Sequence, residues 1–236
     1  MNTQTIKETA YSRTELMLGA RGVERLRRAH VAVFGVGGVG GFAAEALARA
    51  GVGEITLIDS DRVSESNINR QIIALSSTVG MLKTDAMMQR IVDINPSIKV
   101  NCLPIFFDTD TDCVDFSRFD YVIDAIDSLK PKLYLIESAK AMGVRIISAM
   151  GAGGKLDPTR FRVADISKTT VCPLAKHVRT ELRRRGINHH KVVFSDEPSV
   201  KRVEGCPVGS LSFVPSVMGL ILAGEVIKEL SEVKEG

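Results

Sequence analysis

A glycine-rich turn near the start of the chain constrains the fold more than any other feature. It holds four glycines in a GxGxxG arrangement: Gly35, Gly37, Gly38 and Gly40. The valine-rich run 30–34 before it is too short for a helix and predicts a buried parallel strand. The alanine-rich segment 42–50 after it predicts a helix that ends at Gly51. A strand, a glycine turn and a helix in this order bring backbone N–H groups close to a phosphate, so we predict nucleotide binding.

Strand and helix patterns continue to alternate along the chain. Further strands are predicted at 54–58, 121–123, 144–147, 161–166 and 191–194. Helices are predicted where apolar residues recur at helical spacing, before Pro96, around 129–136, over 173–185 and over 213–230. Alternation of this kind is typical of an α/β fold with a Rossmann-like, doubly wound, mostly parallel sheet.

No proline- or serine-rich linker divides the 236 residues, so we predict a single domain, 1–236. Within it we expect N-terminal helices over 1–30, broken near Gly19 and Gly22, and a nucleotide-binding core over 31–150. The part 151–236 is expected to extend the sheet at its C-terminal end and to bind the substrate.

Charged residues after the second strand decide which nucleotide is expected. Asp59 follows Gly40 by 19 residues and can accept hydrogen bonds from ribose hydroxyls, as it also would in a dinucleotide dehydrogenase. Arg70 and Lys83 offer the cations that a triphosphate needs when pyrophosphate departs, although a single such residue near a helix is often only a surface charge. Asp127, at the carboxyl edge of the sheet, can either hold Mg²⁺ or cap the next helix. Together they favour Mg-ATP over NAD.

The whole array resembles the superfamily that contains ThiF, MoeB, HesA and the ubiquitin-activating enzymes. The matching motifs are Tyr11-Ser-Arg13, the glycine turn, Asp59-x-Asp61, Ser66-Asn67-x-x-Arg70-Gln71, Lys83 and Asp124-x-x-Asp127. The resemblance implies adenylation of a carboxylate by ATP and a homodimer.

The resemblance also assigns roles to individual residues. It places Asp59 at the ribose, Gln71 in the wall of the site and Asp127 at magnesium, and it puts three residues at the phosphates: Asn67, Arg70 and Lys83. Asp61 matches a second acid that either contacts the nucleotide or fixes its loop. Arg13 matches an arginine that reaches the nucleotide site, in some members from the partner subunit, and it joins Arg70, Lys83 and Asp127 as an expected catalytic residue.

The sequence constrains less strongly which substrate has its carboxylate adenylated. Members that activate ubiquitin-like sulfur carriers commonly have two CxxC zinc pairs, whereas this chain has four scattered cysteines and no CxxC, so no zinc is expected. Cys206 falls near the position of their catalytic cysteine. Activation of a sulfur-carrier protein, with a sulfur-transfer partner, therefore stays the alternative.

A basic tract favours a nucleic-acid acceptor. The segment 155–202 has twelve Lys or Arg against five Asp or Glu in a chain of net charge +3. Such a tract is often a solvated helix face, or it can hold the phosphates of tRNA. Its residues are Lys176, Arg179, Arg183, Arg184 and Arg185, with Lys191 and the His189-His190 pair beside them.

The segments 157–158, 165–175 and 192–195 resemble the branch of the superfamily that dehydrates threonylcarbamoyladenosine in tRNA. That resemblance implies an ATP-dependent tRNA-modifying ligase or cyclase, in which the tethered carbamoyl group closes a ring on the adenylated carboxylate without an enzyme cysteine. An NAD-dependent oxidoreductase is the weakest alternative, because it leaves Arg70, Lys83 and Asp127 without a role.

Features near both ends of the chain indicate where in the cell the protein is expected. The first residues lack the basic and apolar regions of a secretory signal. The apolar stretch 211–226 is interrupted by glycine, serine and proline, which favours a buried helix over a membrane span. We expect a cytoplasmic protein.

Overall fold

One seven-stranded sheet organises the computed structural model, which describes residues 9–111, 113–200 and 205–232. Its strands are β1 (His30–Phe34), β2 (Glu54–Ile58), β3 (Lys99–Leu103), β4 (Tyr121–Asp124), β5 (Arg145–Ala149), β6 (Phe161–Asp165) and β7 (Lys191–Ser195). They lie in the order β3-β2-β1-β4-β5-β7-β6, and all pairings are parallel except that of β6 with β7. The predicted Rossmann-like sheet and its C-terminal extension are confirmed. The functional division at residue 150 stays a prediction.

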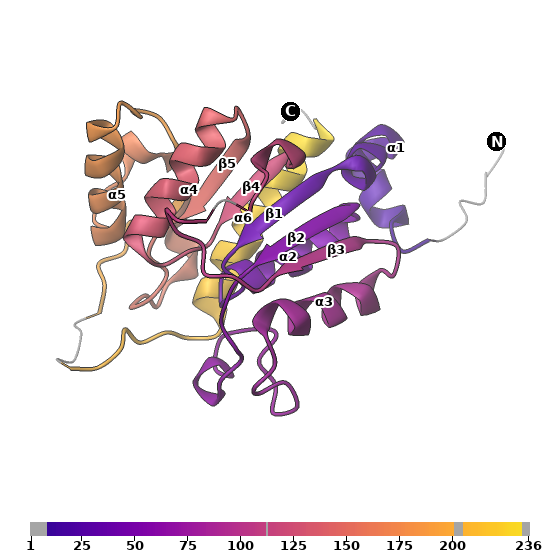
Figure 1. The fold of residues 1–236 in the computed structure, drawn as a ribbon, viewed down its shortest axis with the longest axis horizontal. Coiled ribbons are helices and arrows are strands. Elements are labelled where there is room, and N and C mark those ends of the chain that lie inside the picture. Colours follow the sequence, from indigo (N-terminus) through magenta and orange to yellow (C-terminus); the bar gives the residue numbers. More distant parts are fainter. Residues whose placement is uncertain (1–8, 112, 201–204, 233–236) are drawn as a thin grey trace.

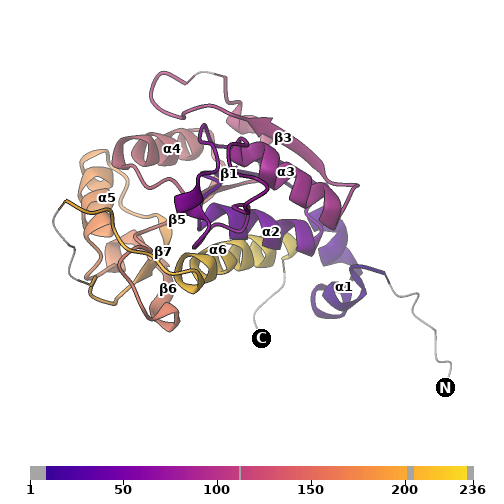
Figure 2. The ribbon, with the colours of Figure 1, turned by 90° about the horizontal axis from the view of Figure 1, so that it is seen from below.

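Helices cover both faces of the sheet (Figures 1 and 2). They are α1 (Ser12–Arg28), α2 (Gly40–Ala50), α3 (Lys83–Ile94), α4 (Leu129–Ala141), α5 (Pro173–Arg184) and α6 (Phe213–Ser231). Helices α2, α3 and α6 lie on one face and α4 and α5 on the other, while α1 packs against the end of α6. Short 3₁₀ turns occur at Glu65–Asn67, Phe116–Arg118, Pro158–Arg160 and Ile166–Lys168.

Strand β1 shows why the sheet is buried on both sides. Val31 and Val33 pack into the cluster beneath α2 and α6, whereas Ala32 and Phe34 pack into the cluster beneath α4 and α5. All four side chains are fully buried. Since successive side chains of a strand point to opposite faces, a continuous apolar run is what a central strand requires.

Three local features differ from, or refine, the sequence analysis. The break in α1 is at Gly19, with φ 70°, whereas Gly22 is helical and packs closely against Ser231 at the end of α6. Strand β3 was not predicted. It is an edge strand that begins with exposed Lys99 and includes Asn101, so it lacks the apolar run of a central strand. No helix in the described part of the chain is long and apolar enough to cross a membrane.

Candidate active site

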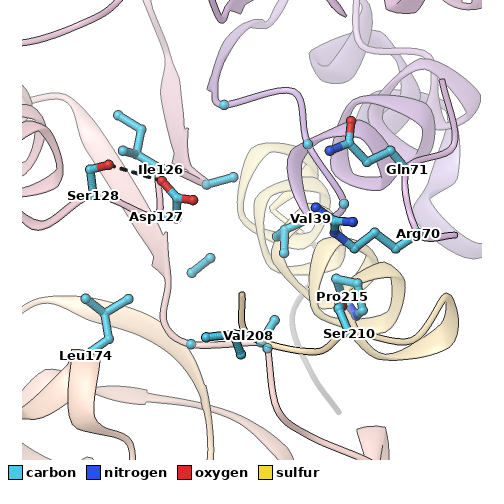
Figure 3. Close-up of a pocket in the computed structure, with 18 of the residues that line it drawn as sticks. Val39, Arg70, Gln71, Ile126, Asp127, Ser128, Leu174, Val208, Ser210 and Pro215 are labelled. Atoms are coloured by element: carbon cyan, nitrogen blue, oxygen red, sulfur yellow. Dashed lines mark hydrogen bonds between the residues drawn. The ribbon is translucent and has the colours of Figure 1, made fainter. Parts of the chain in front are cut away.

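A cavity of about 1220 Å³ opens where the parallel strands end. One half is lined by the glycine turn, the loop after β2, Lys83, the turn after β4, and Asn67, Arg70 and Gln71. We call this the nucleotide half. The other half, which we call the acceptor half, is lined within 149–156, 172–174 and 199–211. In Figure 3, Arg70 and Gln71 lie on one side of the cavity, Asp127 and Ser128 lie across from them, and Val208 lies below.

The glycine turn brings the chain from β1 into α2 with little room for side chains. Gly35 has φ +85°, which an L side chain rarely adopts, and a Cβ on Gly40 would lie 1.8 Å from the Gly35 carbonyl oxygen. Helix α2 begins at Gly40 after Val39, whose side chain has no polar atom to cap it. The Gly41 N–H donates to the Gly37 carbonyl oxygen at 2.9 Å, but no side chain caps this end of the helix. Its positive dipole end therefore remains available to a phosphate.

Asp59, Asp61 and Lys83 form a charged cluster beside the glycine turn. Asp59 is partly buried and accepts hydrogen bonds from the backbone N–H of Val36 at 2.7 Å and of Asp61 at 2.8 Å. The buried Lys83 ammonium lies 2.6 Å from the Asp61 carboxylate and 3.9 Å from that of Asp59. Asp61 therefore holds Lys83 in place, and its contact with the nucleotide stays a prediction.

The segment 64–71 presents three predicted residues to the same cavity: Asn67, Arg70 and Gln71. The Asn67 side chain closes the 3₁₀ turn by accepting from the backbone N–H of Ser64 at 3.1 Å. The Arg70 guanidinium donates to the Ser66 carbonyl oxygen at 2.8 Å. Gln71 is buried, and its Oε1 has no hydrogen-bond partner among the described residues. A nucleotide hydroxyl or amino group is a suitable donor for it.

Asp127 lies in the turn that follows β4 and lines the cavity. Its Oδ1 accepts from the Ser128 hydroxyl at 3.2 Å, so Ser128, which precedes α4, is turned towards Asp127. Behind it, buried Asp124 accepts from the Ile126 N–H at 3.1 Å and from the Lys132 ammonium at 2.6 Å. Asp124 and Lys132 are fully buried, and the pair holds the turn that carries Asp127.

The sequence analysis did not identify Lys132. Its only signal in the sequence is a lysine early in a helix, eight residues after the first acid of the Asp124-x-x-Asp127 motif.

Arg13 does not line the cavity of its own chain. It is exposed near the start of α1, where it borders a separate depression with Thr9, Ala10 and Ser12. Within one chain, the expected arrangement of Arg13 with Arg70, Lys83 and Asp127 is therefore not formed.

The basic tract divides into exposed and structural residues. Lys176 and Arg183 are exposed on α5. Arg179 instead donates to the Thr169 carbonyl oxygen at 2.7 Å, which ties α5 to the preceding turn. Arg184 and Arg185 are partly neutralised by Glu181, at 2.5 and 2.8 Å, and Arg185 also lies 3.1 Å from Glu137. The tract therefore offers less free positive charge than its composition predicts.

Two neighbours of the tract were wrongly assigned to phosphate binding. His190 is buried and lies 2.7 Å from the Ser148 hydroxyl. Burial, helped by the charges of Lys140 and Lys132, lowers the pKa of His190 to about 3, so it is neutral at pH 7. Lys191 pairs with Glu225 and Glu229 on α6, away from α5. His189 is exposed, with its ring nitrogen 3.3 Å from Asp165.

Cys206 lines the acceptor half and is exposed. Over residues 9–111, 113–200 and 205–232, no group of three or more His, Cys, Asp or Glu side chains is arranged to hold a metal ion. A metal at this site would therefore need ligands from the nucleotide as well as from the protein.

The fold agrees with comparisons across known proteins. Residues 11–236 match the ThiF family, and the chain belongs to that family.

Within it, the chain is similar to proteins named tRNA threonylcarbamoyladenosine dehydratase. It is 47% identical to the Bacillus subtilis protein of that name, over 93% of this chain and 94% of the relative. It is 39% identical to the Haemophilus influenzae protein, over 89% and 88%. The structure of the Escherichia coli dehydratase in complex with ATP superposes with a TM-score of 0.86 at 36% identity, covering 94% of each chain.

Proposed function

We propose that this protein is an ATP-dependent enzyme that dehydrates threonylcarbamoyladenosine in tRNA by adenylating its carboxylate. One observation carries the proposal: relatives of that name match nearly the whole chain in sequence and in fold. We expect the reaction to take place in the cytoplasm, where tRNA is found.

The chemistry divides into two steps. The threonyl carboxylate attacks the α-phosphorus of ATP, the bond to pyrophosphate breaks, and an acyl-adenylate forms. The carbamoyl group of the same side chain then attacks the activated carbonyl carbon, loses a proton and expels AMP. The oxygen lost from the substrate leaves in AMP. Because the nucleophile is tethered to the carbonyl, ring closure needs orientation more than an external catalyst.

The nucleotide half supplies the groups that the first step requires. The glycine turn, with the N-terminus of α2, binds the phosphates, Asp59 binds the ribose, and Gln71 shapes the site around the nucleotide. Three residues, Asn67, Arg70 and Lys83, bind the phosphates and stabilise the departing pyrophosphate.

A single protein carboxylate fits Mg²⁺ here. Magnesium usually binds through one or two carboxylates together with phosphate oxygens and water, and Asp127 lines the cavity across from Arg70. Asp127 would hold the ion, which would neutralise charge on the phosphates when bound.

The tRNA is expected to lie along α5, whose first residues line the cavity. Lys176 and Arg183 are the two residues of the predicted tract that are exposed and have no ion pair within the described residues. Contacts of this type recognise phosphates and shape, and they leave selection of the nucleoside to the cavity.

We also propose a homodimer in which Arg13 enters the partner's cavity. Arg13 is exposed and does not line its own cavity, which supports this arrangement. Arg13→Ala and Asp127→Asn homodimers should each be inactive, but mixing them under conditions of subunit exchange should restore part of the activity. If exchanged dimers stay inactive while each variant is folded, Arg13 does not act across the interface.

The decisive experiment supplies the purified protein with ATP and tRNA that contains threonylcarbamoyladenosine. Nucleoside mass spectrometry should detect a product lighter by one water, with AMP and pyrophosphate formed in equal amounts. Arg70→Ala should abolish turnover, while Arg28→Ala, a change on the exposed face of α1, should not. If the nucleoside stays uncyclised although the wild-type protein is folded and binds ATP, this function is excluded.

The position of Cys206 in the cavity keeps a second candidate, activation of a ubiquitin-like sulfur carrier with a sulfur-transfer partner. Cys206→Ser should leave tRNA cyclisation unchanged if the first function holds. Loss of cyclisation together with a covalent adduct on Cys206 would favour a cysteine-dependent reaction.

A further inference from the structure

Three lysine side chains among the described residues are buried, and one of them differs from the other two. Lys83 lies 2.6 Å from the Asp61 carboxylate, and Lys132 lies 2.6 Å from that of Asp124. Lys155 is only 3% exposed, yet no carboxylate within the described residues lies at ion-pair distance from it. Its ammonium donates a hydrogen bond to the backbone oxygen of Glu197. Within the described residues, Lys155 is therefore a buried cation that is hydrogen-bonded to a backbone oxygen and has no carboxylate at ion-pair distance.

Burial of a charge without an opposite charge is unfavourable, because the hydration of the ion is lost and not replaced. An ammonium group has three N–H donors, and within the described part of the chain Lys155 uses one of them. The unused donors and the uncompensated charge make Lys155 a suitable partner for an anion.

The backbone around Lys155 is held in place from both sides. Before it, the Gly154 carbonyl oxygen accepts from the Val200 N–H at 2.8 Å. After it, the Glu197 carboxylate accepts from the N–H groups of Leu156 at 2.9 Å and Asp157 at 3.1 Å. A lysine on such a braced segment can bind a ligand with little loss of backbone entropy.

The position of Lys155 in the cavity indicates which anion it binds. It is the only charged side chain among the described residues that line the acceptor half, where its neighbours are apolar residues, glycines and serines. The phosphates have their own cations, Arg70 and Lys83, in the nucleotide half. An anion on the acceptor wall should therefore belong to the other substrate.

We infer that Lys155 binds the carboxylate of the threonylcarbamoyl group and so selects the modified nucleoside. This inference rests on the proposed function. Unmodified adenosine lacks that carboxylate, and binding it would leave the Lys155 charge uncompensated. Lys155 is thus a specificity-determining residue that also orients the carboxylate towards ATP.

The test measures binding of two anticodon stem-loops, one with threonylcarbamoyladenosine and one with adenosine, in the presence of a non-hydrolysable ATP analogue. The wild-type protein should prefer the modified form by about 10- to 100-fold, the range of one charge-assisted hydrogen bond. Lys155→Met should reduce this preference to nearly one, and Lys155→Arg should recover part of it. The affinity for the ATP analogue should stay within twofold in both variants.

The outcomes separate the two proposals. If the wild-type protein does not distinguish the two stem-loops, the proposed function fails. If it does and Lys155→Met distinguishes them equally well, the role of Lys155 is overturned. A structural lysine would lower the thermal midpoint when replaced, whereas removal of an uncompensated buried charge should leave the midpoint of Lys155→Met no lower than that of the wild type. A lowered midpoint with an intact preference would also contradict the inference.

Discussion

The two halves of the cavity differ in how their charged side chains are paired. In the nucleotide half, Lys83 is held by Asp61 and lies near Asp59, whose carboxylate is itself hydrogen-bonded to the backbone. In the acceptor half, Lys155 has no carboxylate partner within the described residues. Internal pairs hold the nucleotide half in shape before ATP arrives. The acceptor half instead leaves its one charge for the substrate to neutralise, which favours selectivity at a cost in stability.

The largest expected effect tests whether the nucleotide half is a catalytic site or only a binding site. Asp127→Asn removes a negative charge and should lower kcat about 10³-fold, while the affinity for ATP changes much less. Steady-state turnover of the modified tRNA and calorimetric titration with ATP measure the two effects. Asp93→Asn, an exposed change on α3, is the control. Equal losses of ATP affinity and turnover would mean that Asp127 serves binding alone.

The next effect contrasts a paired buried lysine with the unpaired one. Lys132→Met leaves Asp124 buried without its cation and should lower the free energy of unfolding by about 3–5 kcal/mol. Urea unfolding measures the change, and Lys130→Met, exposed on the same helix, is the control. The comparison fails if Lys132→Met and Lys155→Met have the same effect on stability.

A smaller effect concerns pH. The folded state lowers the pKa of His190 to about 3, chiefly by burial, whereas an unfolded histidine titrates near 6.5. Below pH 6.5 the unfolded chain therefore binds a proton that the folded chain does not, and stability falls as the pH drops from 6.5 towards 3.

At pH 4.5 this difference amounts to about 2–3 kcal/mol. His190→Gln should lessen the loss of unfolding free energy between pH 7 and 4.5, measured by urea unfolding at each pH. His177→Gln, on the exposed face of α5, is the control. An unchanged pH profile in His190→Gln would contradict the burial of a neutral ring.

The smallest expected effect concerns the surface beyond the acceptor half. Replacing Lys176 and Arg183 together by alanine should weaken tRNA binding about three- to tenfold. The slope of log affinity against log salt concentration should fall by the amount expected for about two phosphate contacts. Electrophoretic or fluorescence titrations at several salt concentrations measure both. Arg179→Ala should instead lower stability, because Arg179 ties α5 to Thr169. If the tRNA affinity of the double variant equals that of the wild type, α5 is not the tRNA surface.

Much of the nucleotide half could be predicted because its residues follow one another at fixed distances from strand ends. Parallel strands end at one edge of the sheet, so the glycine turn, Asp59 and Asp127 had to meet there once the strands were assigned. Strand β3 was missed because an edge strand needs few apolar residues. His190 was misassigned, and the hydrogen bond of Arg179 to Thr169 was not foreseen, because composition does not reveal which charged or polar side chains bond to the protein itself.

The sequence alone determined the mostly parallel sheet, apart from β3, and the glycine turn, since these depend on local periodicity and on residues next to strand ends. The preference for ATP over NAD came from the charged residues Arg70, Lys83 and Asp127. Only the tertiary structure decided which charged side chains are buried and which groups they pair with. Glu197 and Lys155 are 42 residues apart, and only the fold reveals that this lysine is buried with a backbone oxygen as its partner. The same residue type is paired with a carboxylate at Lys132 and, among the described residues, with a backbone oxygen alone at Lys155. The energy of a charge depends on which groups surround it in space and not on its place in the chain.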